Sequence, residues 1–401
     1  MSAPGRTEIL RSEEDFARIL DAWRGIGTLP EHDPDAYRAA LAERGAGPYG
    51  VALTRDGQLV ALLAGRLERG HVSLKVGYWT ALRLPVRRIV IPPHGILGSA
   101  GEDDLRAMVE QVVTDLRSRR ADLAVVEFAE VGSTALRAAR GVAVGFWMRD
   151  RVRERRVHRR LELPATFKEY DKQHKGLLQK VRKFEKAFAG RFEHAILTRE
   201  DQIPAFCEAA GAVAAKAYQR ALGEGFLDGP GDRALLRAAA RSGGLRAFTT
   251  SVDGKLVAFW AGCRTGTHAN FWWTAYDAAY QEYSPGLVSS ARLVERLIAD
   301  GVASLDFGGG DAPYKERLCN AASFEESVRI FAPGVRGALA GLLAALDAFV
   351  GNLARTHLKG LANRLKTPWR RFLARRLARA QPSGEAPAPA PESRPGGEAA
   401  R

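Results

Sequence analysis

The fold is decided by a stretch in the C-terminal third that reads FWWTAYD (271–277), YSPG (283–286), LDFGGGD (305–311) and PYK (313–315). An apolar strand is followed by a turn, an amphipathic helix, a second strand and a glycine-rich polar loop. This order predicts that a helix N-terminus and several titratable side chains lie at one end of an α/β sheet, where open sheets bind ligands.

An internal repeat extends this pattern over the chain. DGQLVA (56–61) and DGKLVA (253–258) each separate two apolar runs, and Asp-Gly between β-prone runs favours a hairpin turn with positive φ. Chance recurrence of Asp-Gly is the alternative. A helix and a short strand ending in acid-Phe follow each hairpin, which predicts two similar α/β lobes. The expected helices and strands are 103–119 with 123–128, and 285–299 with 302–307.

The composition indicates a globular intracellular protein. The chain has 401 residues, of which 46% are hydrophobic, enough for two domains. Its three cysteines, Cys207, Cys263 and Cys319, lack metal-ligand spacing, so we expect no metal and a reducing compartment. The polar, acidic N-terminus predicts no signal peptide, and the protein is expected in the cytoplasm. The best transmembrane candidate, 337–346, is too short, because a span needs about 20 residues.

The net charge of +14 indicates an anionic partner. A helix predicted over 167–188 has a basic face, which contacts an anion or is simply solvated. Over 335–380 an apolar helical stripe runs from Leu339 to Leu365, and after Pro368 a second helical piece carries apolar residues such as Trp369 on one side and arginines elsewhere. A basic amphipathic helix with aromatic anchors is typical of membrane-surface binding. The alternative is a helix packed across the domains with its basic face in water. The tail, 381–401, is rich in Pro, Gly, Ala and Glu and is expected to be disordered.

Residues 276–315 resemble the FemAB/CelD-like branch of the GNAT acyltransferase superfamily. The resemblance rests on Tyr276-Asp277, Tyr283 to Gly286, Asp306-Phe307 and Gly310 to Lys315, and a weaker likeness spans about 160–330. It implies an α/β fold of tandem GNAT-like lobes, with mixed sheets flanked by helices and a C-terminal amphipathic helical extension. The expected parts are an N-terminal lobe (1–160), a C-terminal acyltransferase lobe (161–334), basic amphipathic helices (335–380) and the tail.

Acyl transfer to an amine needs a base, donors for the oxyanion and an acid for the leaving group. Asp306 and Asp311 are candidates for the base or for orienting the amine; the alternative for Asp306 is that it caps the loop or pairs with Lys315. Tyr276 and Tyr314 are candidate acids or core aromatics. His94, in a Pro/Gly loop after a strand, is a further base that Glu127, the counterpart of Asp306, would orient; a structural or exposed histidine is the alternative.

Donor and acceptor contacts are predicted around the same motif. Ser284 is expected to cap a helix that starts at Pro285, leaving amides for a phosphate. The ordinary GNAT pyrophosphate loop is replaced here by EYSPG (282–286). Trp272 and Trp273 are expected on opposite strand faces, one of them lining an acyl channel. The predicted donor-binding residues are Tyr283, Ser284, Gly286, Leu287, Lys315, Lys180, Arg182 and Lys183; the predicted substrate-binding residues are Trp272, Trp273 and Tyr218.

The resemblance implies an N-acyltransferase with its active site between the lobes and no bound cofactor. The expected reaction moves an acyl group from acyl-CoA to an amine on a lipid, such as a sphingoid-like base, or on an envelope saccharide precursor. The basic C-terminus predicts peripheral contact with the inner face of an anionic membrane. Two rivals stay open: an aminoacyl-tRNA-dependent transferase, since some members of the branch use that donor, and a non-catalytic nucleic-acid or membrane binder.

Overall fold

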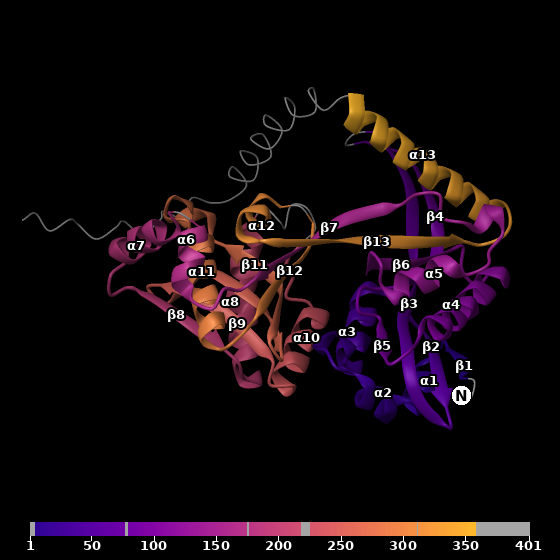
Figure 1. Cartoon of the computed structure of the whole chain (residues 1–401), viewed down its shortest axis with the longest axis horizontal. Helices are drawn as coiled ribbons and strands as arrows, with labels where there is room; N and C mark the ends of the chain where they lie inside the picture. Colours follow the sequence, from indigo (N-terminus) through magenta and orange to yellow (C-terminus); the bar gives the residue numbers. More distant parts are fainter. Residues whose placement is uncertain (1–4, 77–78, 175, 218–224, 311, 358–401) are drawn as a thin grey trace, which may run out of the picture. The chain divides into compact units, whose positions relative to one another are not determined.

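The computed structural model describes residues 5–76, 79–174, 176–217, 225–310 and 312–357 (Figure 1). The chain divides into two compact units. Of the described residues, the first unit contains 5–161, Gly229–Ser242 and 307–357, and the second contains Glu162–Asp228 and Gly243–Asp306. The division at Leu161 adjoins the expected lobe boundary, whereas the segment from Phe307 onward groups with the first unit.

The first unit is built on a mixed sheet with strand order β1-β2-β3-β4-β6-β13-β7, and β5 pairs with β3. Only β4 and β6 run parallel among the pairs of this unit's described strands. The strands are β1 (Arg6–Leu10), β2 (Gly47–Arg55), β3 (Gln58–Val76), β4 (Trp79–Ile91), β5 (Ile96–Gly98), β6 (Leu123–Glu130), β7 (Glu154–Glu162) and β13 (Ala321–Phe331).

Helices cover both faces of this sheet because successive residues of its strands point to opposite sides. Val51 and Leu63 face a core formed with α4, while Ala52 and Leu62 face a second core formed with α1 and α2. The helices of the unit are α1 (Glu13–Arg18), α2 (Leu20–Ile26), α3 (Pro34–Arg44), α4 (Glu102–Arg117), α5 (Thr134–Gly141), α10 (Pro230–Arg241), α12 (Pro313–Leu318) and α13 (Val335–His357), with short 3₁₀ turns at Pro30–His32 and Phe146–Met148.

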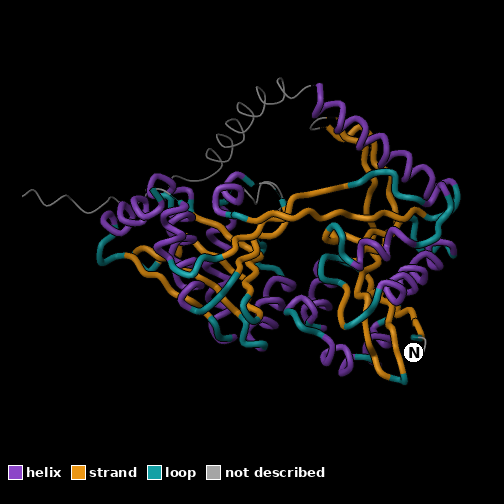
Figure 2. Tube along the Cα trace, in the orientation of Figure 1, coloured by secondary structure: helices purple, strands orange, loops and turns teal. Residues whose placement is uncertain are grey.

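The second unit has strand order β12-β11-β10-β9-β8, with α8 packed on β10 and β11 and α11 packed on β9, β10 and β11 (Figure 2). Phe259 of β10 meets Phe206 of α8, with ring centroids 5.6 Å apart. The elements are α6 (Phe167–Gln173), α7 (Leu177–Ala187), β8 (Phe192–Leu197), α8 (Ile203–Lys216), β9 (Leu245–Val252), β10 (Lys255–Thr265), β11 (His268–Tyr276), α11 (Pro285–Ala299) and β12 (Ser304–Gly309), with 3₁₀ turns η3 (Glu200–Gln202) and η4 (Ala278–Tyr283).

Both predicted hairpins are confirmed. The turn between β2 and β3 places Asp56 at φ 51° and Gly57 at φ 77°. The turn between β9 and β10 places Asp253 at φ 51° and Gly254 at φ 72°. Two consecutive positive φ angles define the tight turn that Asp-Gly favours. The downstream order of helix and strand is also present in both units, as α4 with β6 and α11 with β12.

The single helix predicted over 167–188 is wrong. Two helices stand there, α6 and α7, and the chain between them turns at Gly176 with φ 85°. Tyr170, Val181 and Phe184 are all buried, so the apolar spacing was read correctly. The apolar spacing alone does not predict the break between the two helices. Gly176 allows a left-handed turn there, and each helix buries its own apolar side.

The prediction that the apolar run after Gly337 is too short for a membrane span is also wrong. Among the described residues, Val335–Leu353 of α13 is long and apolar enough to cross a membrane by length and composition alone. Asp347 does not end the helix; its carboxylate accepts a hydrogen bond from the Lys75 amide of β3 at 2.6 Å. The predicted second basic helix after Pro368 and the tail 381–401 lie outside the described residues.

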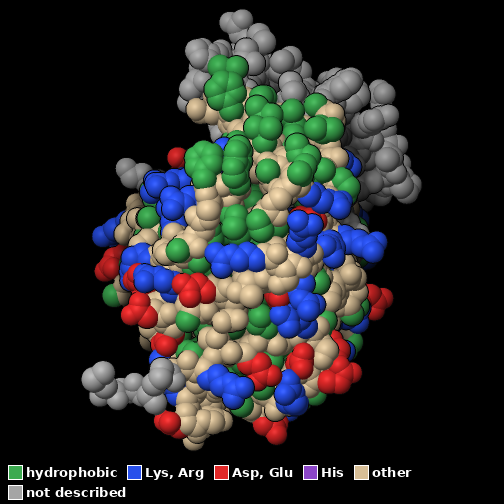
Figure 3. All heavy atoms as spheres, turned by 90° about the vertical axis from the view of Figure 1, so that its right-hand side faces the viewer, with side chains coloured by type: hydrophobic (Ala, Val, Ile, Leu, Met, Phe, Trp, Pro, Cys, Tyr) green, Lys and Arg blue, Asp and Glu red, His purple; other side chains and the backbone are tan. Residues whose placement is uncertain are grey.

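Two faces of α13 are apolar. Ala340, Leu343 and Ala344 are buried, and the first and last of them pack with Phe331 and Val125 of the sheet. A second stripe is exposed, and Figure 3 shows apolar side chains gathered over the top of the molecule, where α13 lies. The exposed residues recur every three or four positions along one helical face and are Val335, Leu339, Leu342, Leu346, Phe349 and Leu353.

Candidate active site

The ladder between β11 and β12 is short. Parallel pairing runs from His268–Ser304 to Asn270–Asp306, whereas β11 continues to Tyr276. On that side the residues from Trp273 to Tyr276 have no strand partner within the described chain, and their peptide groups form a free edge. A strand edge of this kind binds extended ligands through backbone hydrogen bonds.

A β-bulge changes the direction of the side chains at the start of this edge. Ala261 of β10 pairs with Trp273 and Gly262 pairs with Phe271, so Trp272 is the extra residue on β11. Trp272 and Trp273 have ring centroids 5.4 Å apart, and the prediction that they lie on opposite faces is wrong. Both rings are half-buried, and Trp273 packs on Phe226 at 5.3 Å. A bulge cannot be predicted from alternation, because alternation assumes an unbroken register.

The first turn of α11 packs against the end of β11. A Cβ added at Gly286 would lie 3.1 Å from Cδ1 of Tyr276, so the backbone comes close to that ring. Ser284 occupies the N-cap position with φ 53°, but its hydroxyl forms no capping bond, contrary to prediction. The Leu287 amide already donates to the Ser284 carbonyl at 3.0 Å. Within the described residues no acceptor is found for the Gly286 amide, which leaves it for an anion at the positive end of the helix.

The turn η4 before α11 is held by charged groups. Lys216 forms an ion pair with the buried Asp277 at 2.8 Å, and Asp277 also accepts from the Ala279 amide. Lys183 of α7 donates to the Glu282 carbonyl at 3.3 Å and lies 5.3 Å from the ring centroid of Tyr283. Predicted donor-site residues Lys183 and Tyr283 are thus brought together.

The other two predicted cations of α7, Lys180 and Arg182, are exposed. Tyr218 and Asp311 lie outside the described residues, so their predicted roles stay predictions. Asp306 is half-buried and occupies the last position of β12 that pairs with β11.

Lys315 fixes the glycine loop after β12. Its ammonium donates to the Gly309 carbonyl at 2.8 Å and to the Gly308 carbonyl at 3.4 Å, and the residue is buried. The neighbouring Tyr314 lies with its ring 6.5 Å from that of Phe307. The predicted donor-binding lysine therefore positions the loop backbone in the first unit.

The sequence reading missed a charged cluster beside this loop. Arg156 of β7 donates to Glu325 of β13 at 2.6 Å, its guanidinium lies over the Phe128 ring at 3.4 Å, and His158 reaches the same carboxylate at 2.8 Å. Burial acts to raise the pKa of Glu325, but the hydrogen bonds from His158 and Arg156 hold it below its usual value. Arg156 and His158 are two positions apart on β7. This period of two is the one signal in the sequence that their side chains lie on the same face of the sheet.

Glu127 lines a separate cavity of about 720 Å³ in the first unit. Burial raises the pKa of its carboxyl, against the opposing charges of Arg66 and Arg88. Three residues of α13 border the same cavity, Ala344, Asp347 and Ala348. His94 is exposed at φ 62° and its described interactions are with His32. The structure therefore does not bring His94 to Glu127, and the predicted orienting contact is not found.

Comparisons with known proteins agree with this arrangement. Residues 171–316 match the family model of the acetyltransferase (GNAT) domain. The solved structure of FemX matches with a TM-score of 0.53 at 10% sequence identity, covering 84% of this chain and 100% of FemX. No curated protein sequence matches the chain.

Two further solved structures show lower similarity. L-PGS from Bacillus licheniformis has 16% identity and a TM-score of 0.47, covering 82% of this chain and 98% of that protein. A tandem GNAT protein from the clavulanic acid biosynthesis pathway has 13% identity and a TM-score of 0.44, covering 83% of this chain and 100% of that one. Residues 171–316 therefore match a GNAT acetyltransferase domain, the chain shares the fold of FemX, and the protein is a transferase.

Proposed function

We propose that this protein transfers an acyl group from acyl-CoA to an amine carried by a lipid at a membrane surface. The observation that carries the lipid acceptor is the exposed apolar stripe of α13, with Val335 at 79% and Phe349 at 65% of full exposure. Contiguous apolar surface of this kind on a protein mostly covered by polar groups marks a membrane or partner contact. An amine on an envelope saccharide precursor would not require it.

The donor is proposed to bind along the free edge of β11. An extended pantetheine arm offers amide groups that the unpaired peptide groups of this edge can bind, and a donor phosphate would accept from the Gly286 amide. The rings of Trp272 and Trp273 supply apolar surface near the bulge. The sequence lacks the ordinary pyrophosphate loop, so the single helix-terminal amide would bind less tightly than that loop.

Asp306 is proposed as the base. It takes a proton from the acceptor ammonium, and the freed nitrogen attacks the thioester carbonyl. The tetrahedral intermediate loses its second nitrogen proton to solvent water, from which Tyr314 is later reprotonated, and its collapse forms the amide and breaks the carbon–sulfur bond. The CoA thiolate leaves with a proton, for which Tyr314 is the proposed source. No covalent enzyme intermediate is needed.

The test uses the full chain with a long-chain acyl-CoA and a long-chain amine in phosphatidylglycerol vesicles, and mass spectrometry of the amide. Asp306→Asn is expected to lower kcat/KM by about 10²-fold or more because the base is lost. Asp201→Asn is the matched control, since Asp201 is exposed in the same unit and pairs only with the exposed Arg199 among the described contacts. It should leave the rate unchanged.

Three results would contradict the proposal. Turnover of short water-soluble amines at the same rate as the long-chain amine would exclude a lipid as the specific acceptor. Transfer from aminoacyl-tRNA with no turnover of acyl-CoA would replace the donor. An Asp306→Asn variant as active as the parent would remove Asp306 from the reaction.

A further inference from the structure

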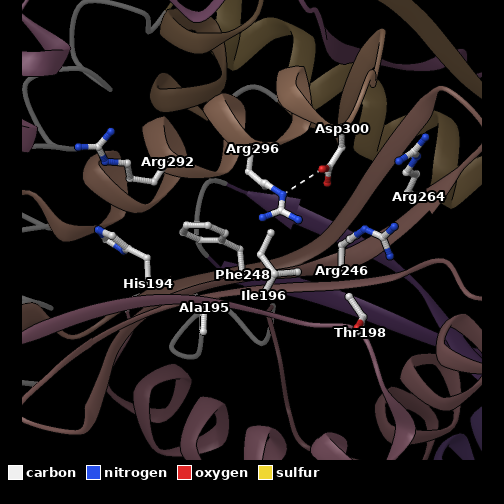
Figure 4. Close-up of a pocket in the computed structure, with 10 residues that line it drawn as sticks. All are labelled: His194, Ala195, Ile196, Thr198, Arg246, Phe248, Arg264, Arg292, Arg296 and Asp300. Carbon is white, nitrogen blue, oxygen red and sulfur yellow. Dashed lines mark hydrogen bonds and ion pairs between the residues drawn. The ribbon is translucent and has the colours of Figure 1, made fainter.

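A second cavity lies in the second unit, and its lining includes none of the residues to which the acyl transfer is assigned. It has a volume of about 590 Å³ and lies between the strands β8 and β9 and the C-terminal half of α11 (Figure 4). Arg296, which borders it, follows Pro285 by eleven residues in sequence, so about 16 Å of helix separates the cavity from the start of α11. The charged or titratable side chains of its lining are His194, Arg246, Arg264, Arg292, Arg296 and Asp300.

The charges of this lining do not balance. Arg292 is neutralised by hydrogen bonds to Glu185 and Glu295, and Arg296 pairs with Asp300 at 2.9 Å. Arg246 and Arg264 form no ion pair with a carboxylate among the described residues. Two guanidinium groups therefore face the cavity without a bound counter-charge.

Backbone contacts hold these two guanidinium groups in place. Arg246 donates to the Leu245 carbonyl at 2.7 Å, and Arg264 donates through Nε to the Gly266 carbonyl at 2.8 Å. Each guanidinium has five N–H donors, so both retain donors for a ligand. Figure 4 shows that Arg246, Arg264 and Arg296 border the cavity from three elements, β9, the end of β10 and α11.

The positive charges of the arginines that line the cavity repel one another. Burial, with the nearby charge of Arg264, lowers the pKa of Arg246. A partly buried charge is stabilised when an opposite charge binds within a few ångströms. Guanidinium groups match phosphate oxygens in geometry, and such charge-assisted hydrogen bonds are among the strongest in proteins.

The remainder of the cavity suits an organic group. The rings of His194 and Phe248 are stacked with centroids 5.9 Å apart. Within the described chain, Nε2 of His194 is buried without a hydrogen-bond partner. The volume falls within the range of small-molecule sites and exceeds the need of a bare phosphate ion.

We propose that this cavity binds a small phosphorylated molecule, with its phosphate on Arg246 and Arg264 and its organic part against His194 and Phe248. The site is separate from the acyl-transfer residues and does not depend on the proposed function. A phosphate group is also present in phospholipid headgroups, but the ring wall formed by His194 and Phe248 favours a soluble metabolite with a ring of its own.

The probes are inorganic pyrophosphate, adenosine 5′-diphosphate and phosphatidylglycerol vesicles, each titrated into the full chain by calorimetry at one fixed ionic strength. Saturable binding of the soluble probes is expected. Arg246→Ala and Arg264→Ala should each weaken it by about ten- to a hundredfold, because each removes a charge-assisted contact. Arg246→Lys keeps the charge but loses the fork and should weaken binding less.

Arg24→Ala is the matched control, because Arg24 is exposed on α2 of the other unit. This variant should bind the soluble probes as tightly as the parent does. Thermal unfolding of every variant separates lost binding from lost folding, and if Arg246→Ala does not fold, Arg264→Ala decides. The proposal is overturned by a parent that binds neither soluble probe, by alanine variants that bind as well as the parent, or by binding to the vesicles alone.

Discussion

Glu127 is a carboxylic acid of the first unit whose pKa is raised by the fold. Its carboxyl lines a cavity, and burial raises its pKa above the ordinary value of 4.5 although Arg66 and Arg88 oppose the shift. The folded chain therefore binds this proton more tightly than the unfolded chain does. The unfolding free energy must then fall as pH rises from the ordinary carboxyl pKa through the raised one.

Glu127→Gln removes this titration. We expect the variant to gain stability relative to the parent on going from pH 4 to pH 7.5, because only the parent loses free energy in that window. Urea unfolding at both pH values measures the difference. Glu208→Gln, at an exposed glutamate of α8, should show no comparable change, and an equal difference at both pH values for Glu127→Gln would contradict the assigned pKa direction.

Single residues also show where the sequence reading reached its limit. Asp306 and Lys315 were found because each stands in a contiguous motif with strand and loop signals around it. Arg156 and Glu325 were not found, because they are 169 positions apart and only the pairing of β7 with β13 brings them together. A pair of this kind becomes visible only once strand register is known.

The end of β12 and the neighbouring β7 illustrate packing between elements. A Cβ added at Gly309 would lie 2.3 Å from Nε of Arg156. That guanidinium is held between Glu325 and the Phe128 ring, so it cannot yield without breaking an ion pair.

Gly309→Ala is therefore expected to destabilise the fold by about 1–3 kcal/mol, the usual cost of overpacking. In the Arg156→Ala background the same change should cost clearly less, since the clashing atoms are gone. Urea unfolding of the four chains gives the coupling. Gly101→Ala, where the nearest atom is 3.6 Å away, is the control; additive costs at Gly309 and Arg156 would refute the contact.

Elements with strong local signals were predicted well, and those that depend on distant contacts were not. α11 has the expected bounds because Pro285 fixes its start. The Asp-Gly hairpins hold because their turn chemistry is local. The break between α6 and α7 and the bulge at Trp272 were not predicted. Gly176 allows the break but does not require it, and the bulge depends on the register between β10 and β11.

At the scale of the whole chain, the proposed membrane contact would draw on two sources of affinity. The net charge of the chain is +14, which attracts anionic lipid and weakens as salt screens it. The exposed stripe of α13, which includes Leu342 and Phe349, supplies apolar area whose burial depends little on salt. These two contributions are separable by ionic strength.

The parent chain should sediment with phosphatidylglycerol vesicles at low salt and keep part of that binding at 0.5 M salt, a concentration at which the Debye length is only about 4 Å. In the variant Leu342→Asp/Phe349→Asp the retained part should disappear, because each exposed apolar side chain contributes about 1.5–3 kcal/mol when buried in lipid. Binding at low salt should decrease but persist. Leu82→Asp changes an equally exposed leucine on β4 and should behave as the parent does. If the double variant keeps its salt-resistant binding, α13 is not the lipid contact, and the acceptor would then have to be sought among soluble amines.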